Sequence, residues 1–260
     1  MAGYELQVHR DFGSRALPAR NILVCVPPGY DSSRTRRYPV LYLQDGQNLF
    51  ADAASPLSGR GWRLDITAAT LIAEHAIEPL LLVGIPNMGE GRTAEYTPTF
   101  NAERRIGGKG ALYGKLLVEE IKPFIDQSYR TLPEPQHTGL GGSSFGALIA
   151  LYVGLHYPQV FGQLALLSLA VAWNLPALLE LIEEAPMQHA PRIWLDAGTA
   201  EEAGIVKGTR AVRDALIARG WVLGSNLAYH EAPGARHTEE AWAQRVPLFL
   251  RYLFPASPNL

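Results

Sequence analysis

The chain has 260 residues, of which 47% are apolar and 18% charged, so it is long and apolar enough to bury a sizeable core. Its net charge of −2 lacks the basic excess that binding to nucleic acid or an anionic membrane requires. The single cysteine, Cys25, excludes an internal disulfide and a cysteine-based metal site. We see no apolar run of membrane-spanning length and no signal peptide, so we expect a cytoplasmic protein with no membrane partner.

Short apolar runs bounded by Gly, Pro, Asn and Asp predict the strands of this chain. In chain order they cover residues 5–10, 21–26, 39–44, 80–85, 138–142, 164–169, 192–196 and 227–230. The run at 39–44 is apolar at nearly every position, as expected of a strand covered on both faces. No helix separates the first two strands, which favours an antiparallel edge of the sheet.

Segments with helical spacing lie between the later strands. They cover residues 64–76, 112–126, 145–157, 175–183, 209–219 and 239–252. Residues 89–110 instead predict a long polar, glycine-rich loop, a feature that is usually functional or mobile. The alternation of strands and helices predicts an α/β fold with a mostly parallel sheet covered on both faces, in a single domain over residues 1–260.

The sequence Gly142-Ser143-Ser144-Phe145-Gly146 joins the predicted central strand to a helix. It matches the Gly-x-Ser-x-Gly pattern, in which a strained turn exposes the middle serine at the end of a sheet. The two glycines must lack side chains because segments of the turn close on each other. Ser144 is therefore the candidate nucleophile, and the alternative is a glycine-rich turn with capping serines.

A serine nucleophile needs a histidine base that is itself held by a carboxylate, and in this architecture both follow the serine in the chain. His237 lies in the loop after the last strand, at the same sheet edge as Ser144, and is the candidate base. The acid is expected after the preceding strand, where Glu201 is the first choice. The adjacent Glu202 and the strand residue Asp196 are the alternatives.

The oxyanion of an acyl-transfer intermediate needs preorganised N–H donors. We expect one from the backbone N–H of Phe145, immediately after the nucleophile. The other is expected from the loop after residue 44, where Asp45-Gly46-Gln47 allows the Gln47 N–H to approach closely. A plain Asp-Gly turn is the alternative.

The connection between the strands at 164–169 and 192–196 is too short for a large cap domain, so we expect an open site. Further residues are candidates for substrate contacts: Trp62 and Trp173 as aromatic walls, and Asp45, Arg92 and Tyr96 as polar groups. For both tryptophans, burial in the core is the alternative.

The chain resembles the esterase D family of α/β-hydrolases, which stands beside feruloyl esterases, trilactone siderophore esterases and mycolyltransferases. The resemblance is carried by residues 38–50 (Tyr-Pro-Val-Leu-Tyr-Leu-Gln-Asp-Gly-Gln-Asn-Leu-Phe), by residues 119–126, by the Ser144 turn and by residues 196–199 (Asp-Ala-Gly-Thr). It extends from Asn21 to Phe254, and Asp-Gly-Gln-Asn-Leu-Phe is its most specific stretch.

The resemblance implies an α/β-hydrolase fold with Ser144 as nucleophile, His237 as base, an acid near Glu201, and Gln47 and Phe145 as oxyanion donors. Two positions depart from the family pattern, because Gln44 stands where a histidine is common and Glu201 where an aspartate is common.

We therefore predict a serine carboxylic-ester hydrolase that acts through an acyl-enzyme on a small-molecule ester. No cofactor, metal or nucleic-acid partner is expected. An acyltransferase or thioesterase with the same residues and a catalytically silent binding protein are the alternatives. The sequence leaves the identity of the ester and the oligomeric state open.

Overall fold

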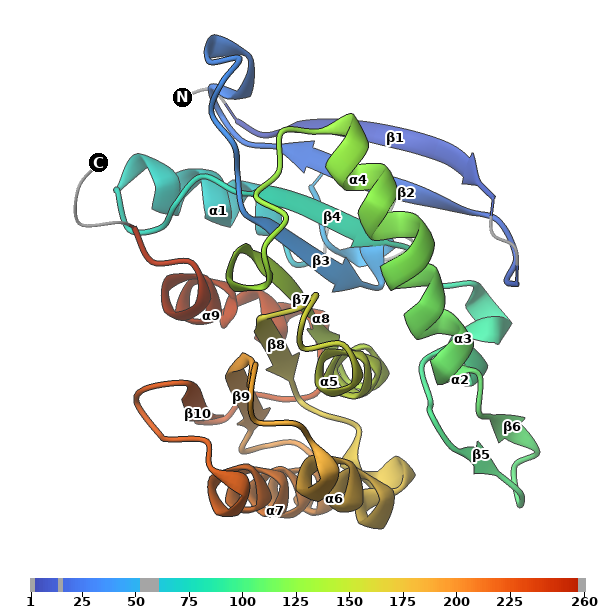
Figure 1. Cartoon of the computed structure of the whole chain (residues 1–260). Helices are drawn as coiled ribbons and strands as arrows, with labels where there is room; N and C mark the ends of the chain where they lie inside the picture. The colour runs from blue at the N-terminus through green and yellow to red at the C-terminus, as the bar shows by residue number, and fades with distance from the viewer. Residues whose placement is uncertain (1–2, 14–15, 52–60, 257–260) are drawn as a thin grey trace.

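The computed structural model describes residues 3–13, 16–51 and 61–256, and an eight-stranded sheet runs through its centre (Figure 1). The strands of this sheet are β1 (Glu5–Phe12), β2 (Arg20–Val26), β3 (Val40–Gln44), β4 (Leu81–Ile85), β7 (Thr138–Ser143), β8 (Gln163–Leu167), β9 (Arg192–Gly198) and β10 (Leu227–Ala232). Most of them coincide with the predicted strands to within two residues.

The strand order is β1-β2-β4-β3-β7-β8-β9-β10. β1 pairs antiparallel with β2 and β2 antiparallel with β4, whereas every pair from β4 to β10 is parallel. The predicted parallel sheet with an antiparallel N-terminal edge is therefore confirmed. Because the strands from β4 to β10 are parallel, their carboxyl ends meet at one edge, where open α/β sheets commonly hold their ligands.

Helices cover both faces of the sheet, as expected (Figure 1). They are α1 (Leu64–Ala73), α2 (Arg92–Glu95), α3 (Gly110–Lys115), α4 (Lys122–Ser128), α5 (Phe145–His156), α6 (Leu175–Glu184), α7 (Ala203–Arg219), α8 (Glu239–Ala243) and α9 (Val246–Leu253). The helices α3 to α7 share one apolar core with the sheet, and α1, α8 and α9 share another. β3 contributes to both cores, since Val40 and Tyr42 enter the first and Leu41 and Leu43 the second.

The segment 89–110, predicted as a loop, contains short elements. After a 3-10 turn it forms α2 and a hairpin of β5 (Phe100–Asn101) and β6 (Ile106–Gly107), which Figure 1 shows apart from the central sheet. Elements of this length carry no readable periodicity. The segment packs against β2 through a buried ion pair, in which Arg20 Nη1 lies 2.8 Å from Glu95 Oε2 and both side chains are nearly inaccessible. Because both residues are charged, the sequence did not indicate that they are buried.

Two predicted helices are interrupted. Residues 116–121 between α3 and α4 form a π-helical stretch just before Pro123, whose missing N–H interrupts α-helical hydrogen bonding. The helix predicted over 239–252 is divided into α8 and α9, and Pro247 lies in the first turn of α9, where proline is favoured.

The described connection between β8 and β9 forms no cap domain over the carboxyl edge of the sheet. Between β8 and β9 the chain forms only the 3-10 turn η6 (Val171–Trp173) and α6, in agreement with the sequence. Across residues 3–13, 16–51 and 61–256, we find no helix with the length and apolar character needed to cross a bilayer.

Candidate active site

The turn between β7 and α5 holds Ser144 in a strained backbone conformation. Its φ of 57° and ψ of −120° lie outside the regions that residues with a side chain favour. A Cβ at Gly142 would lie 2.9 Å from the carbonyl carbon of Gly146, and one at Gly146 would lie 3.0 Å from the Cβ of Gln44. The two glycines therefore allow the turn to close on itself and on the end of β3, with half-buried Ser144 at the start of α5.

His237 and Glu201 form a hydrogen-bonded pair in the loops that follow β10 and β9. Nδ1 of His237 lies 2.9 Å from Oε2 of Glu201. Because an ionised carboxylate only accepts hydrogen bonds, Nδ1 carries the hydrogen and Nε2 of the neutral ring is left as the acceptor. The side chain of His237 is 34% exposed and that of Glu201 is fully buried, so the accessible group of the pair is the imidazole.

Hydrogen bonds keep the Glu201 carboxylate ionised. Its Oε1 accepts from the Ser168 hydroxyl at 2.6 Å and from the Gly198 N–H at 2.7 Å. Burial by itself would raise the pKa of Glu201, but the hydrogen bonds from His237, Ser168 and Gly198 outweigh burial and lower that pKa below its ordinary value.

The two alternative acids occupy different surroundings. Glu202 is exposed at the N-terminus of α7. Asp196 is buried within β9, where it accepts from Trp194 Nε1 at 2.8 Å and lies 3.0 Å from Arg245 Nη1. Burial raises the pKa of Asp196 to about 6, against the opposing effect of Arg245. Among the three acids, the described residues place only Glu201 in hydrogen-bond contact with His237.

The backbone N–H groups of Phe145 and Gln47 lie on adjacent elements. Phe145 is the first residue of α5, so its N–H has no acceptor within the helix. Gln47 lies in the 3-10 turn η2 (Gly46–Asn48), directly after β3. Since β3 pairs with β7, this turn and the start of α5 are neighbours at the edge that holds Ser144.

The carboxylate of Asp45, an expected substrate contact, is engaged by protein groups. Its carboxylate accepts from Arg92 Nε at 2.7 Å and Nη2 at 2.8 Å, and from Asn87 Nδ2 at 2.6 Å. The guanidinium of Arg92 in turn lies 5.6 Å from the ring centre of Phe145. Asp45 therefore positions Arg92, and the more exposed of the two side chains is that of Arg92.

Burial contradicts two further expected substrate contacts. Trp62 is 2% exposed and packs in the core beside Trp242, where its indole N–H donates to Glu239 at 2.5 Å. Tyr96 is completely buried, and its hydroxyl accepts from the Asp45 N–H at 3.2 Å. Both rings support the backbone of the site and do not line it.

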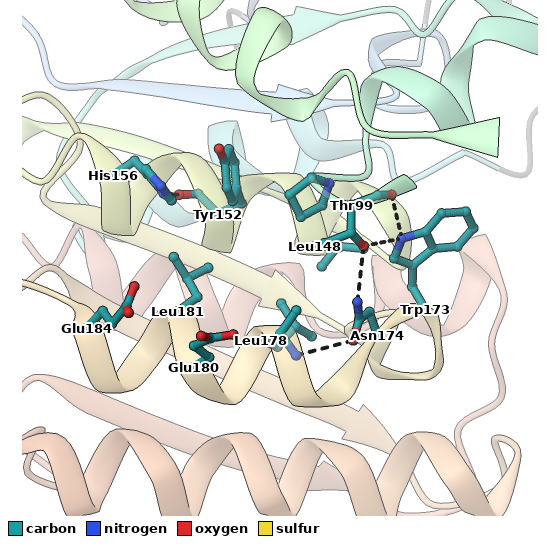
Figure 2. A pocket seen from close by; sticks show the side chains of 12 residues that line it. Thr99, Leu148, Tyr152, His156, Trp173, Asn174, Leu178, Glu180, Leu181 and Glu184 are labelled. Atoms are coloured by element: carbon teal, nitrogen blue, oxygen red, sulfur yellow. Dashed lines mark hydrogen bonds between the residues drawn. The ribbon is translucent and has the colours of Figure 1, made fainter. Parts of the chain in front are cut away.

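Trp173 borders a groove of about 210 Å³ between α5 and α6 (Figure 2). Its indole N–H donates to Thr99 Oγ1 at 3.1 Å, and its ring packs edge-to-face on Phe145 with centres 5.5 Å apart. Most of the groove is lined by the largely apolar side chains of Leu148, Tyr152, Leu178 and Leu181. The polar side chains of His156, Glu180 and Glu184 lie toward the end away from Trp173. Leu148 follows Ser144 by one helical turn and lies at the Trp173 end, so the groove starts near the candidate nucleophile.

Three side chains around these residues escaped the sequence analysis: Ser168, Arg245 and Glu239. Ser168 follows β8 and contacts Glu201, but the predicted strand at 164–169 included this residue, so the sequence did not place it in a loop at the edge of the sheet. Arg245 is buried between α8 and α9, a placement that an arginine in a predicted helix does not indicate, because arginine is usually exposed.

Glu239 links the loop of His237 to the turn η2, which carries Gln47. Its carboxylate accepts from Trp62 Nε1 and, at 3.0 Å, from Asn48 Nδ2. Burial, with a contribution from nearby Asp45, raises the pKa of Glu239 to about 7.

The described residues bring Glu201 into contact with His237 and place Gln47 and Phe145 at the edge of Ser144. Between Ser144 Oγ and His237 they form no hydrogen bond. Such contacts commonly tighten when substrate binds.

A family model with the description "Putative esterase" matches residues 16–257 of the chain. The protein YbbA of Bacillus subtilis (strain 168) is 25% identical over 247 residues, which are 90% of this chain and 92% of YbbA.

Solved structures share the fold. A CE1 ferulic acid esterase from Anaeromyces mucronatus, in complex with ferulic acid, superposes with a TM-score of 0.72 at 20% identity, over 96% of this chain and 91% of that one. The enterobactin esterase FES from Shigella flexneri gives a TM-score of 0.75 at 20% identity, over 95% of this chain and 58% of that one.

The raised pKa of Glu239 predicts a pH-dependent stability. Since its pKa is about 7 in the folded protein and its ordinary value is 4.5, the folded state binds more protons between these pH values, and stability falls as pH rises through them. Glu239→Gln has no group that titrates at this position, so its stability should not fall in this way as pH rises. The difference in Tm, variant minus parent, should therefore increase by about 2–4 °C from pH 5 to pH 8. The matched control is the exposed neighbour, Glu240→Gln, and a Tm difference independent of pH for Glu239→Gln would contradict the prediction.

Proposed function

The chain belongs to the esterase family, which makes it a carboxylic-ester hydrolase, and we propose that it acts through Ser144 and an acyl-enzyme intermediate. The observation that carries the proposal is the Glu201–His237 hydrogen bond at the sheet edge that also holds the strained Ser144 turn. A serine of this kind requires such a base and acid to become a nucleophile.

In the acylation step, His237 Nε2 takes the proton of Ser144 Oγ as the oxygen attacks the ester carbonyl carbon. The Gln47 and Phe145 N–H groups stabilise the negative charge that develops on the carbonyl oxygen. The bond to the alcohol oxygen then breaks, and the alcohol leaves with the proton carried by His237. Glu201 stays ionised and stabilises the imidazolium.

In the deacylation step, His237 takes a proton from water and the resulting hydroxide attacks the acyl carbon. The bond to Ser144 Oγ breaks, His237 returns the proton to that oxygen, and the carboxylic acid departs. Every proton moves between Ser144, His237, water and the two products, so these residues need no cofactor for the reaction.

For the substrate we propose a small-molecule ester with a short acyl or aryl group. The edge without a cap domain supports an open site, and the exposed part of Arg92 is available to polar substrate groups. The relatives named above as ferulic acid and enterobactin esterases favour aryl esters among these. We further propose a single domain and a cytoplasmic location.

Replacing the nucleophile tests the proposal. Ser144→Ala should lower kcat/KM for p-nitrophenyl acetate by several orders of magnitude, because no other group supplies the attacking oxygen. Steady-state hydrolysis of the acetate, butyrate and octanoate esters and of methyl ferulate measures this, with Ser143→Ala as the matched control. Equal rates for the parent and Ser144→Ala would overturn the mechanism.

The choice of acid has its own test. Glu201→Gln should reduce kcat far more than Glu202→Gln, since only Glu201 holds His237 Nδ1. The two variants remove the same charge at adjacent positions, so Glu202→Gln controls for the change in net charge. The reverse ranking would assign the acid to Glu202.

The proposed substrates carry a short acyl or aryl group, and we propose that the groove beside Trp173 takes up the end of the acyl chain when a longer test ester binds. Ala177→Phe would fill part of this groove and should lower kcat/KM for p-nitrophenyl octanoate about tenfold while leaving the acetate unchanged, because a few buried methylenes account for such a factor. Ala211→Phe, in a different surface hollow between α6 and α7, is the matched control. If Ala177→Phe leaves the ratio of kcat/KM for octanoate to kcat/KM for acetate unchanged, the acyl chain does not bind in this groove.

A further inference from the structure

The hydroxyl of Ser168 lies at the centre of a buried hydrogen-bond network behind the Glu201–His237 pair. Ser168 follows β8, which lies between β7, the strand before Ser144, and β9, the strand that leads to Glu201. It is completely buried, and its φ of 47° is unusual for a residue with a side chain. A strained backbone at a buried position indicates that the direction of this side chain matters.

The network fixes the direction in which the Ser168 hydroxyl donates. Its oxygen accepts from Trp242 Nε1 at 2.8 Å and from Arg245 Nη2 at 3.0 Å. An indole N–H and a guanidinium have no acceptor capacity, so both bonds run toward the serine oxygen. The one hydroxyl hydrogen is therefore directed to Glu201 Oε1, which lies 2.6 Å away.

The same contacts determine which oxygen of Glu201 faces His237. Oε1 is engaged by Ser168 and by the Gly198 N–H, and Oε2 lies against Nδ1 of His237. If Oε1 were protonated, its hydrogen would face the hydrogens that Ser168 and Gly198 donate to that oxygen. If Oε2 were protonated, its hydrogen would face the hydrogen on Nδ1 of His237. Glu201 is thereby held ionised and in a single rotamer, and the hydrogen of the neutral imidazole is held on Nδ1.

We propose that Ser168 is a positioning residue for the base, which acts through Glu201 to keep Nε2 of His237 free to take the serine proton. This inference rests on the proposed function, since it deepens the role of Glu201 and His237. The Ser168 hydroxyl bonds to Glu201, Trp242 and Arg245 and not to His237, so its contribution runs through the carboxylate of Glu201.

Arg245 supports this arrangement by its charge. Its side chain is 2% exposed, and Nη1 lies 3.0 Å from Asp196 Oδ1 and 3.9 Å from Glu201 Oε1. The backbone N–H of Ser168 also donates to Asp196 Oδ1 at 3.2 Å. Ser168 thus connects both buried carboxylates to the one guanidinium between them.

Ser168→Ala and Ser168→Gly together test the proposal. Both remove the hydroxyl, and glycine also removes the strain of the positive φ, so a folded variant is available even if the alanine one is unstable. The matched control is Thr209→Val, which removes another fully buried hydroxyl that bonds to Ile205 O within α7. Two readouts apply: kcat and KM for p-nitrophenyl acetate, and the downfield proton signal of Nδ1–H in protein labelled with ¹⁵N-histidine, assigned by its loss in His237→Ala.

Both Ser168 variants should lose about 10- to 100-fold in kcat with KM unchanged, the effect of removing a hydrogen bond to a charged group. The Nδ1–H signal should weaken or move upfield in both, and Thr209→Val should match the parent in both readouts. Folded Ser168 variants with the parent's kcat and signal would overturn the positioning role. If Glu201→Gln and Ser144→Ala also keep full activity, the proposed function itself fails, so the two failures are distinguishable.

Discussion

The guanidinium of Arg245 lies against two buried carboxylates, those of Asp196 and Glu201, at the carboxyl edge of the sheet. Moving a carboxylate from water into a protein interior costs several kcal/mol unless a partner compensates it. Asp196 and Glu201 both lie within 4 Å of Arg245 Nη1, and their side chains are inaccessible. The C-terminal helices therefore do more than cover the sheet, because the residue that joins α8 to α9 balances the charge on which the orientation of His237 depends.

The parallel strands explain why residues from distant parts of the chain meet at this edge. Ser144, Ser168, Glu201 and His237 each follow a different strand of the consecutive set β7 to β10. Each loop begins at a position set by the ladder, so a few residues of loop suffice to bring the side chains together. The paired strands thus fix the positions of the residues at the start of each loop, whereas loops in general tolerate changes of sequence.

The sequence allowed the fold class and the Ser144 turn to be predicted, because strand–helix alternation and the spacing of Gly142 and Gly146 are local signals. The Glu201–His237 contact could be anticipated from the order of elements, as both follow strands of one edge. The burial of Trp62 and Tyr96 could not, since it depends on packing between segments far apart in the chain. The network of Ser168 likewise arises from tertiary pairing, which leaves no pattern along the sequence.

The carboxylate of Glu239 has a consequence for how the protein is made. It accepts hydrogen bonds from Asn48 and Trp62, which precede it by 191 and 177 residues. A ribosome releases the turn η2, which carries Gln47 and Asn48, well before the segment from His237 to Arg245. The candidate site is therefore assembled only after Arg245 has left the ribosome, and chains terminated before His237 lack both the candidate base and the cation behind Glu201.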